Sequence, residues 1–576
     1  MFLVCLDLKW KFQWYVGSLN DDSQPQATKV LMVIGVGVAG RWRLPLCYWL
    51  TDGTDAQLQE ALLKSIISKL WQCGCCVVSV TMDGLAANQK TLRNLGCNFD
   101  PKGLVSIFPH TDCDDMQVAA VFDACHMMKL ARNCLNEYQI LKIPGVGKVK
   151  WEHIKQLHSV QTGEGLTLAN KLTKAHVNYK TQKMKVKLAV QVISASCAKA
   201  IEYLRLTGSP AFADSLPTEL FLRKLDKLFD YLNCRSAFGK GYKSPINAAN
   251  AAARIGFLEE TRQFLLTLED SNGKRLVDTK RRMFVIGLCV TINSVIYLTQ
   301  KLILQAGING VKLRYLLTYK MSQDHIEILF SIIRRRGGWC NNPTAMQFRL
   351  AYRAILCHVG VVPLTHSNCL TNCTDDILAD ENTDSSDLFV ESAVALQDHC
   401  YATLLPTLSK YVENVATYIA GFVVRKLLPR LKCGQCRSLL VDADNINAPS
   451  SSFLQLKNNG GLVTPSAAVV RIVHIAERNL RAVTAHDKPI YTIAKLGSKL
   501  ESMVIEDVDI SHIFGHTTHL EDTLDGIENH VSSLTRQVVK FYLQIRKFHI
   551  VKSWNISQRG TVVRQKLTKL VLFSNQ

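Results

Sequence analysis

The sequence predicts a mixed α/β core that is interrupted by an all-helical insertion and followed by a helical C-terminal region. Two observations predict the first parts: strand and helix patterns alternate over residues 1–145, and residues 146–316 show helical periodicity without a convincing strand. The chain has 576 residues, of which 47% are hydrophobic and 20% charged, so most of it can bury a core. At this length we expect about three or four folding units.

The first elements are two apolar segments rich in β-branched and aromatic residues. Residues 29–38 and 43–50 are joined by a glycine-containing turn, which predicts adjacent antiparallel strands. A helix is predicted next because leucine and isoleucine recur at four-residue steps. The later elements are a helix over 55–72, strands over 75–82 and 118–122 that end at Asp83 and Asp123, and helices over 85–95 and from about His126. This order is that of a ribonuclease H-like core, whose first strand we expect before Lys29.

Residues 146–316 form the predicted insertion. Its helical segments cover residues 151–157, 185–204, 217–232 and 282–306. Residues 317–370 then return to the core with two helices. They cover residues 324–336 and 344–356, with Ser322 and Asn342 as the expected N-caps.

Two further regions complete the predicted organisation. Residues 371–400 are acidic and rich in Ser, Thr and Asn, which predicts a mobile loop because such a segment buries little apolar surface. Residues 401–576 form the predicted C-terminal helical region.

The charge of the chain favours a polyanionic partner. It contains 68 Lys and Arg against 48 Asp and Glu, for a net charge of +20 and a pI near 9.2. Nucleic acid is the leading candidate, although many proteins are basic without binding it. The 19 cysteines lack the spacing of a disulfide framework, which indicates a reducing compartment. Apolar runs at 30–39 and 283–298 are shorter than the roughly 20 residues that a membrane span needs, so we expect no membrane partner.

A metal-dependent nuclease needs three converging acids, and the sequence places two of them well. Asp83 ends a buried strand, and Asp324 and Glu327 lie three positions apart near the start of a helix. Carboxylates from separate elements hold the Mg²⁺ ions of two-metal nucleases. The alternatives are a turn-forming Asp and ordinary capping of a helix N-terminus.

Basic side chains follow on the same two helices. Arg334, Arg335, Arg336 and Arg349 are candidate DNA-binding residues, since guanidinium groups bind phosphate well. A solvated basic face is the alternative.

Four stretches resemble one family. They are VVSVTMDGLAANQKTLRNLGC (77–97), FDACHMMKLARN (122–133), LTYKMSQDHIEILFSIIRRRGGWCNNPTAMQFRLAYRAIL (317–356) and YIAGFVVRKL (418–427). The chain is similar in these stretches, and in their order, to P-element transposases and the related THAP-domain transposase-derived proteins. The resemblance implies a nuclear, homo-oligomeric enzyme that cuts and joins DNA at transposon ends and target sites.

The same resemblance assigns roles to the acids. Asp83 would be the second and Glu327 the third catalytic acid, both binding Mg²⁺, and Asp324 would lie between the nuclease centre and a nucleotide pocket. Asp123 and His126 match an Asp-x-x-His motif of such transposases. The alternative for this pair is a strand-to-helix cap followed by a buried histidine.

The family's insertion binds GTP as a cofactor. Residues 228–233 resemble the segment that contacts guanine, which implies binding roles for Phe229, Asp230 and Asn233. Without the resemblance, the sequence favours a core stripe of Leu225, Leu228, Phe229 and Leu232 over guanine binding. Residues 145–148 lack the spacing of a phosphate-binding Walker loop.

Cys433 and Cys436 form one half of a candidate zinc site. A Cys-x-x-Cys turn lets two thiolates share one ion, and His516, His519 and His530 are candidates to complete it. Buried free cysteines are the alternative.

The sequence departs from the family pattern near its N-terminus. No zinc-coordinating THAP domain, coiled coil or Asp-Glu-Met strand with the first catalytic acid is visible, and Asp7 is the local substitute. We therefore expect a truncated transposase of doubtful activity. Its rivals are a domesticated or decayed protein that binds DNA or a partner without cutting, and a guanine-nucleotide-binding module on a nuclease scaffold.

Overall fold

The structure is a computed structural model that divides into two compact units, each considered by itself. Unit 1 is Met1–Ser159 with Asn170–Ser386, and unit 2 is Val160–Ala169 with Asp387–Gln576. The described residues are 2–9, 27, 29–40, 42–53, 55–168, 170–305, 312–336, 343–357, 407–484, 496–508, 513–514, 520–523 and 526–558. Within these ranges, the side chains of 2–9, 179, 181, 496–498, 520–529 and 551–558 are not described.

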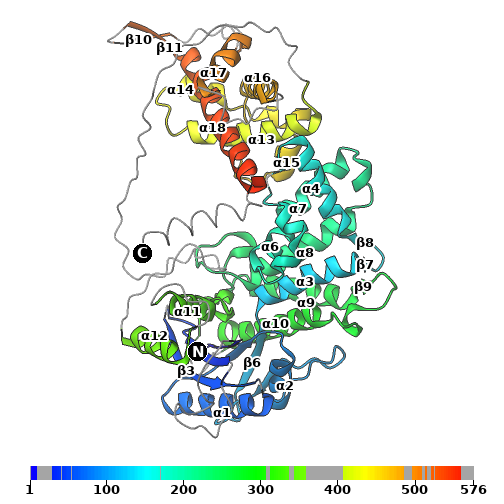
Figure 1. Ribbon diagram of the computed structural model, residues 1–576, viewed down its shortest axis with the longest axis vertical. Coiled ribbons are helices and arrows are strands. Elements are labelled where there is room, and N and C mark those ends of the chain that lie inside the picture. Colours follow the sequence, from blue (N-terminus) through cyan, green and yellow to red (C-terminus); the bar gives the residue numbers. More distant parts are fainter. Residues whose placement is uncertain are drawn as a thin grey trace, which may run out of the picture. The chain divides into compact units, whose positions relative to one another are not determined.

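A six-stranded mixed sheet forms the core of unit 1 (Figure 1). Its strands are β1 (Phe2–Lys9), β2 (Lys29–Val36), β3 (Arg43–Thr51), β4 (Ser79–Met82), β5 (Ile107–Pro109) and β6 (Gln117–Phe122). They lie in the order β3-β2-β1-β4-β6-β5; β1, β4 and β6 run parallel, and β2, β3 and β5 are antiparallel to their neighbours. The expected first strand before Lys29 is therefore present as β1, between β2 and β4.

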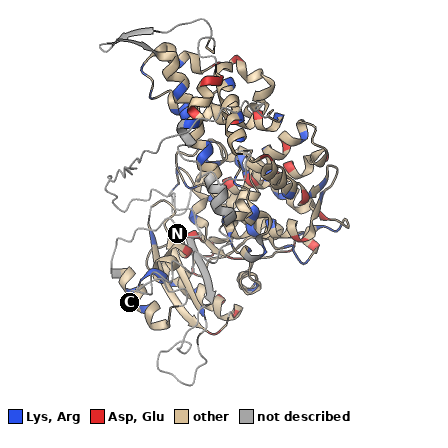
Figure 2. Ribbon diagram, turned by 45° about the horizontal axis from the view of Figure 1, so that its top comes forward, with Lys and Arg blue, Asp and Glu red and all other residues tan. Residues whose placement is uncertain are grey.

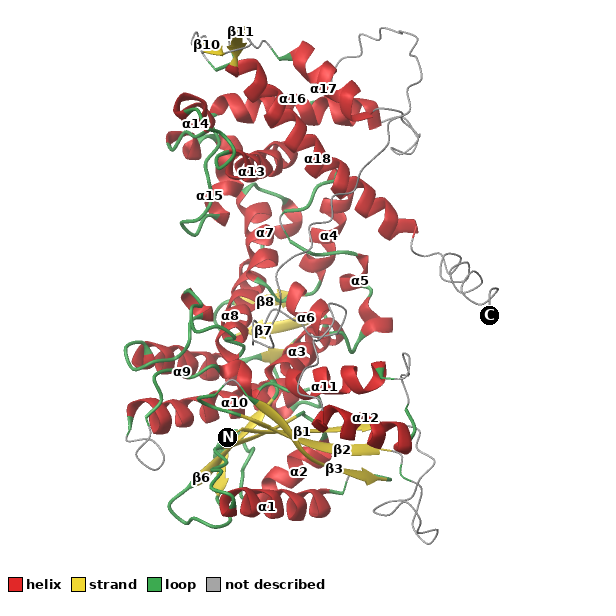
Figure 3. Cartoon of the chain, turned by 90° about the vertical axis from the view of Figure 1, so that its left-hand side faces the viewer, coloured by secondary structure: helices red, strands yellow, loops and turns green. Residues whose placement is uncertain are grey.

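Helices cover both faces of this sheet (Figure 3). They are α1 (Ala56–Gln72), α2 (Ala86–Leu95), α10 (Met283–Thr299), α11 (Asp324–Arg335) and α12 (Ala345–Cys357), and α3 (Ala124–Tyr138) packs on α10. From Val30 to Val36 every residue of β2 is buried, because α1 packs on one face and α11 on the other. The side chain of Asp55 caps α1 at the N-cap position by accepting hydrogen bonds from the Gln57 and Leu58 amides.

Helix α10 is the most apolar helix of the core. The segment Met283–Leu304 is long and apolar enough to cross a membrane by length and composition, but 72% of its most apolar window is buried inside the protein. The hydroxyl of Thr291 donates to the Phe122 carbonyl at 2.8 Å and accepts from the Phe122 amide at 3.0 Å. These bonds anchor the helix to β6, which is the role of a core helix.

The insertion is not all-helical. Its helices are α4 (Glu152–Glu164), α5 (Lys174–Val177), α6 (Val186–Val192), α7 (Ala195–Leu206), α8 (Leu216–Leu232) and α9 (Ala251–Thr267). They are accompanied by a three-stranded sheet of β7 (Ile140–Ile143), β8 (Gly147–Lys150) and β9 (Glu269–Asp270). The prediction that residues 146–316 contain no strand is therefore wrong, and the Gly-Val-Gly-Lys segment at 145–148 belongs to the β7–β8 hairpin.

Three local expectations also need correction. The helix predicted over 185–204 is two helices, because the Ser194 hydroxyl caps a new helix by accepting from the Cys197 amide. The strand predicted over 75–82 is paired only from Ser79 onward. Ser322 does not cap α11: Gln323 is the N-cap residue, without a side-chain cap, and the Ser322 hydroxyl is buried without a hydrogen-bond partner.

Unit 2 is predominantly helical, as expected for residues 401–576. Its elements are α13 (Lys410–Leu427), α14 (Gly434–Leu440), α15 (Ser452–Lys457), α16 (Ala467–Thr484), α17 (Leu496–Asp507), β10 (Leu520–Thr523), β11 (Gly526–Asn529) and α18 (His530–Gln558). The apolar faces of α13, α16, α17 and α18 share one core. The predicted acidic loop at 371–400 and the predicted cap Asn342 lie outside the described residues.

Candidate functional site

Asp83 stands at the carboxyl end of β4, where the sequence places it. Its carboxylate is buried, and Oδ1 accepts hydrogen bonds from the Leu85 amide at 2.9 Å and from Asn88 Nδ2 at 2.7 Å. One oxygen therefore shapes the turn into α2, as a turn-forming Asp would. This role does not exclude a metal ligand, because a carboxylate has two oxygens and several lone pairs.

Asp123 joins the starts of two helices that are distant in the sequence. Its Oδ2 accepts from the His126 amide at 2.7 Å and caps α3, while Oδ1 accepts from the Gln323 amide at 3.1 Å beside α11. Burial raises the pKa of Asp123 to about 7, helped by the negative charges of Asp324 and Glu327. The two amide hydrogen bonds oppose that shift but do not cancel it.

Lys129 is a buried cation among the carboxylates that sequence reasoning missed. Burial lowers its pKa, whereas the charges of Glu327, Asp123 and Asp83 raise it. Its Nζ lies 3.3 Å from Nδ1 of His126, one helical turn earlier, and burial lowers the pKa of His126 to about 3. The acids at the end of β4, at the end of β6 and on α11 thus act on one ammonium group.

Asp324 and Glu327 occupy different environments on α11. Asp324 is buried, and its Oδ2 accepts from Arg235 Nη2 at 2.7 Å. The Arg235 guanidinium also lies 4.0 Å from the centre of the Tyr319 ring. Glu327 is exposed and acts electrostatically on Lys129 and on Arg334.

The third candidate acid, Asp7, lies on β1. The parallel pairing of β1 with β4 runs as far as Val4 opposite Thr81, so Asp7 and Asp83 both follow its last pair. The carboxyl ends of parallel strands meet at one edge of a sheet, which places both backbone positions on the same edge. The side chain of Asp7 is not described. Among the described side chains, no three acids bring their oxygens within 4.8 Å of one another at this edge.

The candidate guanine-binding residues lie at the end of α8. Phe229 is buried with Leu225, Leu228 and Leu232, which confirms the core stripe. Asp230 lies 3.6 Å from Lys243 Nζ, and burial raises the pKa of Asp230.

The loop that follows α8 carries polar and aromatic groups. Asn233 Oδ1 accepts from Arg235 Nε at 3.4 Å, so Asn233 and Asp324 contact the same guanidinium. Phe238 is 89% exposed, and Tyr242 is partly exposed. An aromatic ring open to a ligand is therefore found in this loop rather than at Phe229.

The predicted DNA-binding arginines differ in exposure. Arg336 is exposed, whereas Arg334, Arg335 and Arg349 are partly buried. Burial lowers the pKa of Arg334, and Glu327 partly restores it. Lys and Arg occur in both units, interspersed with Asp and Glu (Figure 2).

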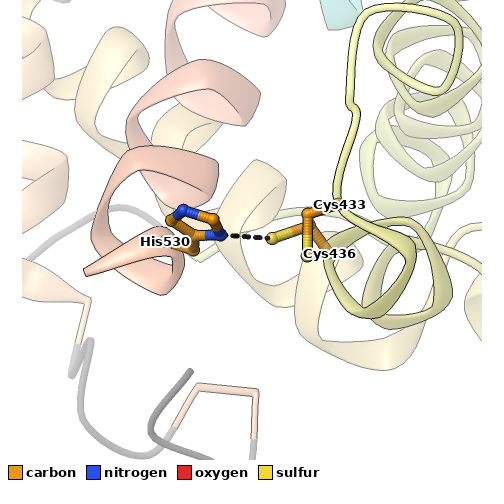
Figure 4. Close-up of side chains that lie close together, drawn as sticks. All are labelled: Cys433, Cys436 and His530. Atoms are coloured by element: carbon orange, nitrogen blue, oxygen red, sulfur yellow. Dashed lines mark hydrogen bonds between the residues drawn. The ribbon is translucent and has the colours of Figure 1, made fainter. Parts of the chain in front are cut away.

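Cys433 and Cys436 converge with His530 in unit 2 (Figure 4). His516 and His519, the other histidines considered for this site, lie outside the described residues.

Models of four protein-domain families match successive segments of the chain. A TNP-like RNase H N-terminal domain matches residues 12–96, and a TNP-like GTP-binding insertion domain matches residues 125–245. A TNP-like RNase H C-terminal domain matches residues 319–353, and the C-terminal domain of DNA transposase THAP9 matches residues 407–552. The human DNA transposase THAP9 is 27% identical over 559 residues, which cover 93% of this chain and 61% of that protein. The chain belongs to the P-element and THAP9-like transposase family.

Other members of the P-element and THAP9-like family agree with this assignment. The transposable element P transposase of Drosophila melanogaster is 24% identical over 421 residues, covering 69% of this chain and 51% of that protein. The chain thus spans about half to three fifths of the length of these two relatives. A solved Drosophila P element transposase strand transfer complex has a TM-score of 0.51 and 24% identity, covering 62% of this chain and 77% of that one. At this identity the likeness supports the fold alone.

Proposed function

We propose that this chain carries the DNA-cleaving and strand-transferring centre of a P-element-like transposase, with Asp83 and Glu327 as acidic ligands of Mg²⁺. The observation that carries the proposal is that acids at the ends of β4 and β6 and on α11 all raise the pKa of the buried Lys129 through their negative charges. Carboxylate oxygens are the donors that Mg²⁺ prefers, and the backbone of Asp7 lies at the same sheet edge. When bound, the metal would activate a water or 3′-hydroxyl and stabilise the leaving oxygen of a DNA phosphodiester.

The residues of the chain support this chemistry in distinct ways. Asp123 fixes the first turns of α3 and α11, so it positions Glu327 relative to the sheet. Arg334, Arg335, Arg336 and Arg349 would contact the DNA backbone, because guanidinium groups bind phosphate strongly. DNA as substrate implies action in the nucleus, and the assembly would be a homo-oligomer.

GTP is the proposed cofactor of the insertion. Asp230 and Asn233 lie at the end of α8, and an Asp that accepts from the amino edge of guanine would select that base. Asp324 contacts Arg235 beside them, so the nucleotide and nuclease parts meet at α11.

A second candidate function is DNA binding without cleavage. The observation that favours it is Lys129, whose ammonium group already compensates the carboxylates with a positive charge. A divalent ion would have to compete with that charge.

Cleavage of supercoiled plasmid DNA in the presence of Mg²⁺ and GTP tests the first function. We expect nicked product from the full chain, and its loss in both Asp83→Asn and Glu327→Gln. Asp278→Asn is the matched control, because Asp278 is a half-exposed acid paired with Arg275. Equal nicking by all variants would show that Asp83 and Glu327 are not catalytic residues. Salt-sensitive DNA binding without any product would support the second function.

A further inference from the structure

Two helix starts in unit 2 bring three soft ligands together. Cys433 is the N-cap residue of α14, Cys436 lies in its first turn, and His530 is the first residue of α18. The two sulfur atoms and a ring nitrogen of His530 all lie within 4.8 Å of one another. Figure 4 shows the imidazole facing both thiols across the gap between the two helices.

The spacing fits a single tetrahedral ion. Sγ of Cys436 lies 3.7 Å from Nδ1 of His530, although the residues are 94 positions apart in the sequence. A zinc ion with bonds of about 2.3 Å to sulfur and about 2.0 Å to nitrogen separates these two ligands by about 3.5 Å. The observed distance between Sγ of Cys436 and Nδ1 of His530 therefore needs to shorten only slightly for both atoms to bind one zinc ion.

The surroundings suit thiolate ligands. The three side chains line an open cavity of about 440 Å³ together with Arg430, Lys432, Ser533 and Gln537. Nearby basic groups and a helix N-terminus both favour the thiolate, which is the form that binds metal. Cys436 is buried while Cys433 and His530 are partly exposed, so the cluster lies at the edge of the core and an ion can reach it.

We propose that Cys433, Cys436 and His530 bind one zinc ion that fastens α14 to α18. Two thiolates and an imidazole select Zn²⁺ over Mg²⁺, so this site is chemically separate from the acidic centre of unit 1. The described residues that line the cavity offer no further Cys, His or carboxylate ligand. The fourth position of the tetrahedron is left for water or for another ligand of the chain.

Metal analysis of the purified full chain tests the zinc site. After mild chelation to remove loosely bound ions, we expect about one zinc per chain. Cys433→Ser, Cys436→Ser and His530→Asn should each lower the zinc content about tenfold or more. The controls are Cys73→Ser, an exposed free cysteine, and His549→Asn, an exposed histidine on the same helix α18.

A second measurement covers variants that fold poorly. In the wild-type protein exchanged with Co²⁺, sulfur-to-cobalt charge-transfer absorption should appear, and a strong chelator should lower the unfolding temperature. His516→Asn or His519→Asn would change the cobalt spectrum only if that residue supplies the fourth ligand. The zinc proposal is wrong if the wild-type protein contains no zinc, or if the ligand and control variants contain equal amounts. It is also wrong if mass spectrometry finds a disulfide between Cys433 and Cys436. None of these results bears on nicking by the acidic centre, so the two proposals fail separately.

Discussion

Replacing Asp123 by Asn should remove a pH-dependent part of the stability of the ribonuclease H-like core. In the unfolded chain this carboxyl titrates near 3.8, whereas in the folded protein its pKa is about 7. Between these values the folded protein holds a proton that the unfolded chain has released. The free energy of unfolding must therefore fall as pH rises from about 4 to about 7, and it levels off above that range.

The size of the effect follows from the two pKa values. At about 1.4 kcal/mol per pH unit, a rise from 3.8 to about 7 corresponds to about 4 kcal/mol. Asn cannot titrate, so Asp123→Asn lacks this slope. Asn also presents an NH₂ group to one of the two amides that Asp123 accepts from, which costs about 1–3 kcal/mol at all pH values.

Hydrogen exchange of peptides containing the Gln323 amide is the direct assay. It should be measured in metal-free buffer from about pH 4.5 to about pH 7.5 and corrected for intrinsic exchange. The opening free energy should fall with pH in the wild-type protein and in the control Asp278→Asn, but stay flat in Asp123→Asn. Equal slopes in all three proteins would refute the idea that buried Asp123 links α3 to α11.

Three further perturbations test other contacts. Glu477→Ala should destabilise unit 2 by about 3–5 kcal/mol, because Glu477 is fully buried and its oxygens accept from Arg546, Arg481 and Tyr542. The expected result is a lower unfolding temperature with faster hydrogen exchange in α16 and α18. Unchanged exchange would contradict this prediction. Arg235→Ala should lower the opening free energy of the first turn of α11 by about 3 kcal/mol, because it leaves the Asp324 carboxylate buried without this partner. Arg275→Ala breaks a surface ion pair and should cost under about 1 kcal/mol in the same exchange measurement. Lys129→Met should lower the unfolding temperature in metal-free buffer, since Asp83, Asp123 and Glu327 lose a nearby positive charge. Mg²⁺ should then stabilise this variant more than the wild-type protein. An equal effect of Mg²⁺ on both proteins would argue against a metal site at these acids.

The strands and helices that local patterns define were predicted well. β2, β3 and α1 follow from apolar runs and four-residue repeats, and the place of β1 follows from the order of the other elements. The small sheet of the insertion was missed. Its strands β8 and β9 are short and polar, and β9 pairs with β7 across more than a hundred residues, so no local pattern marks them.

The residues of the candidate site also fall into those that the sequence predicts and those that it does not. Asp83, Asp123 and Glu327 stand at strand ends or a helix start, and such positions can be recognised in a sequence. Lys129 and Arg235 could not be singled out among 68 basic residues, because what distinguishes them is the distant carboxylates they face. Ser322 was misread as a cap, since a side chain of Asp123 satisfies the Gln323 amide instead.

The arrangement of charges connects the end of α8 to the first turns of α11. Arg235 follows α8 and is held by Asp324 in the first turn of α11, the same turn whose approach is fixed by Asp123. Glu327 lies one turn further along and shares Lys129 with Asp83 and Asp123. If the end of α8 binds GTP as proposed, we expect the nucleotide to act on Asp324 through Arg235 and, through Asp324, on the position of Glu327. If the nucleotide in turn strengthens ion binding at Glu327, linkage requires the ion to strengthen nucleotide binding by the same factor.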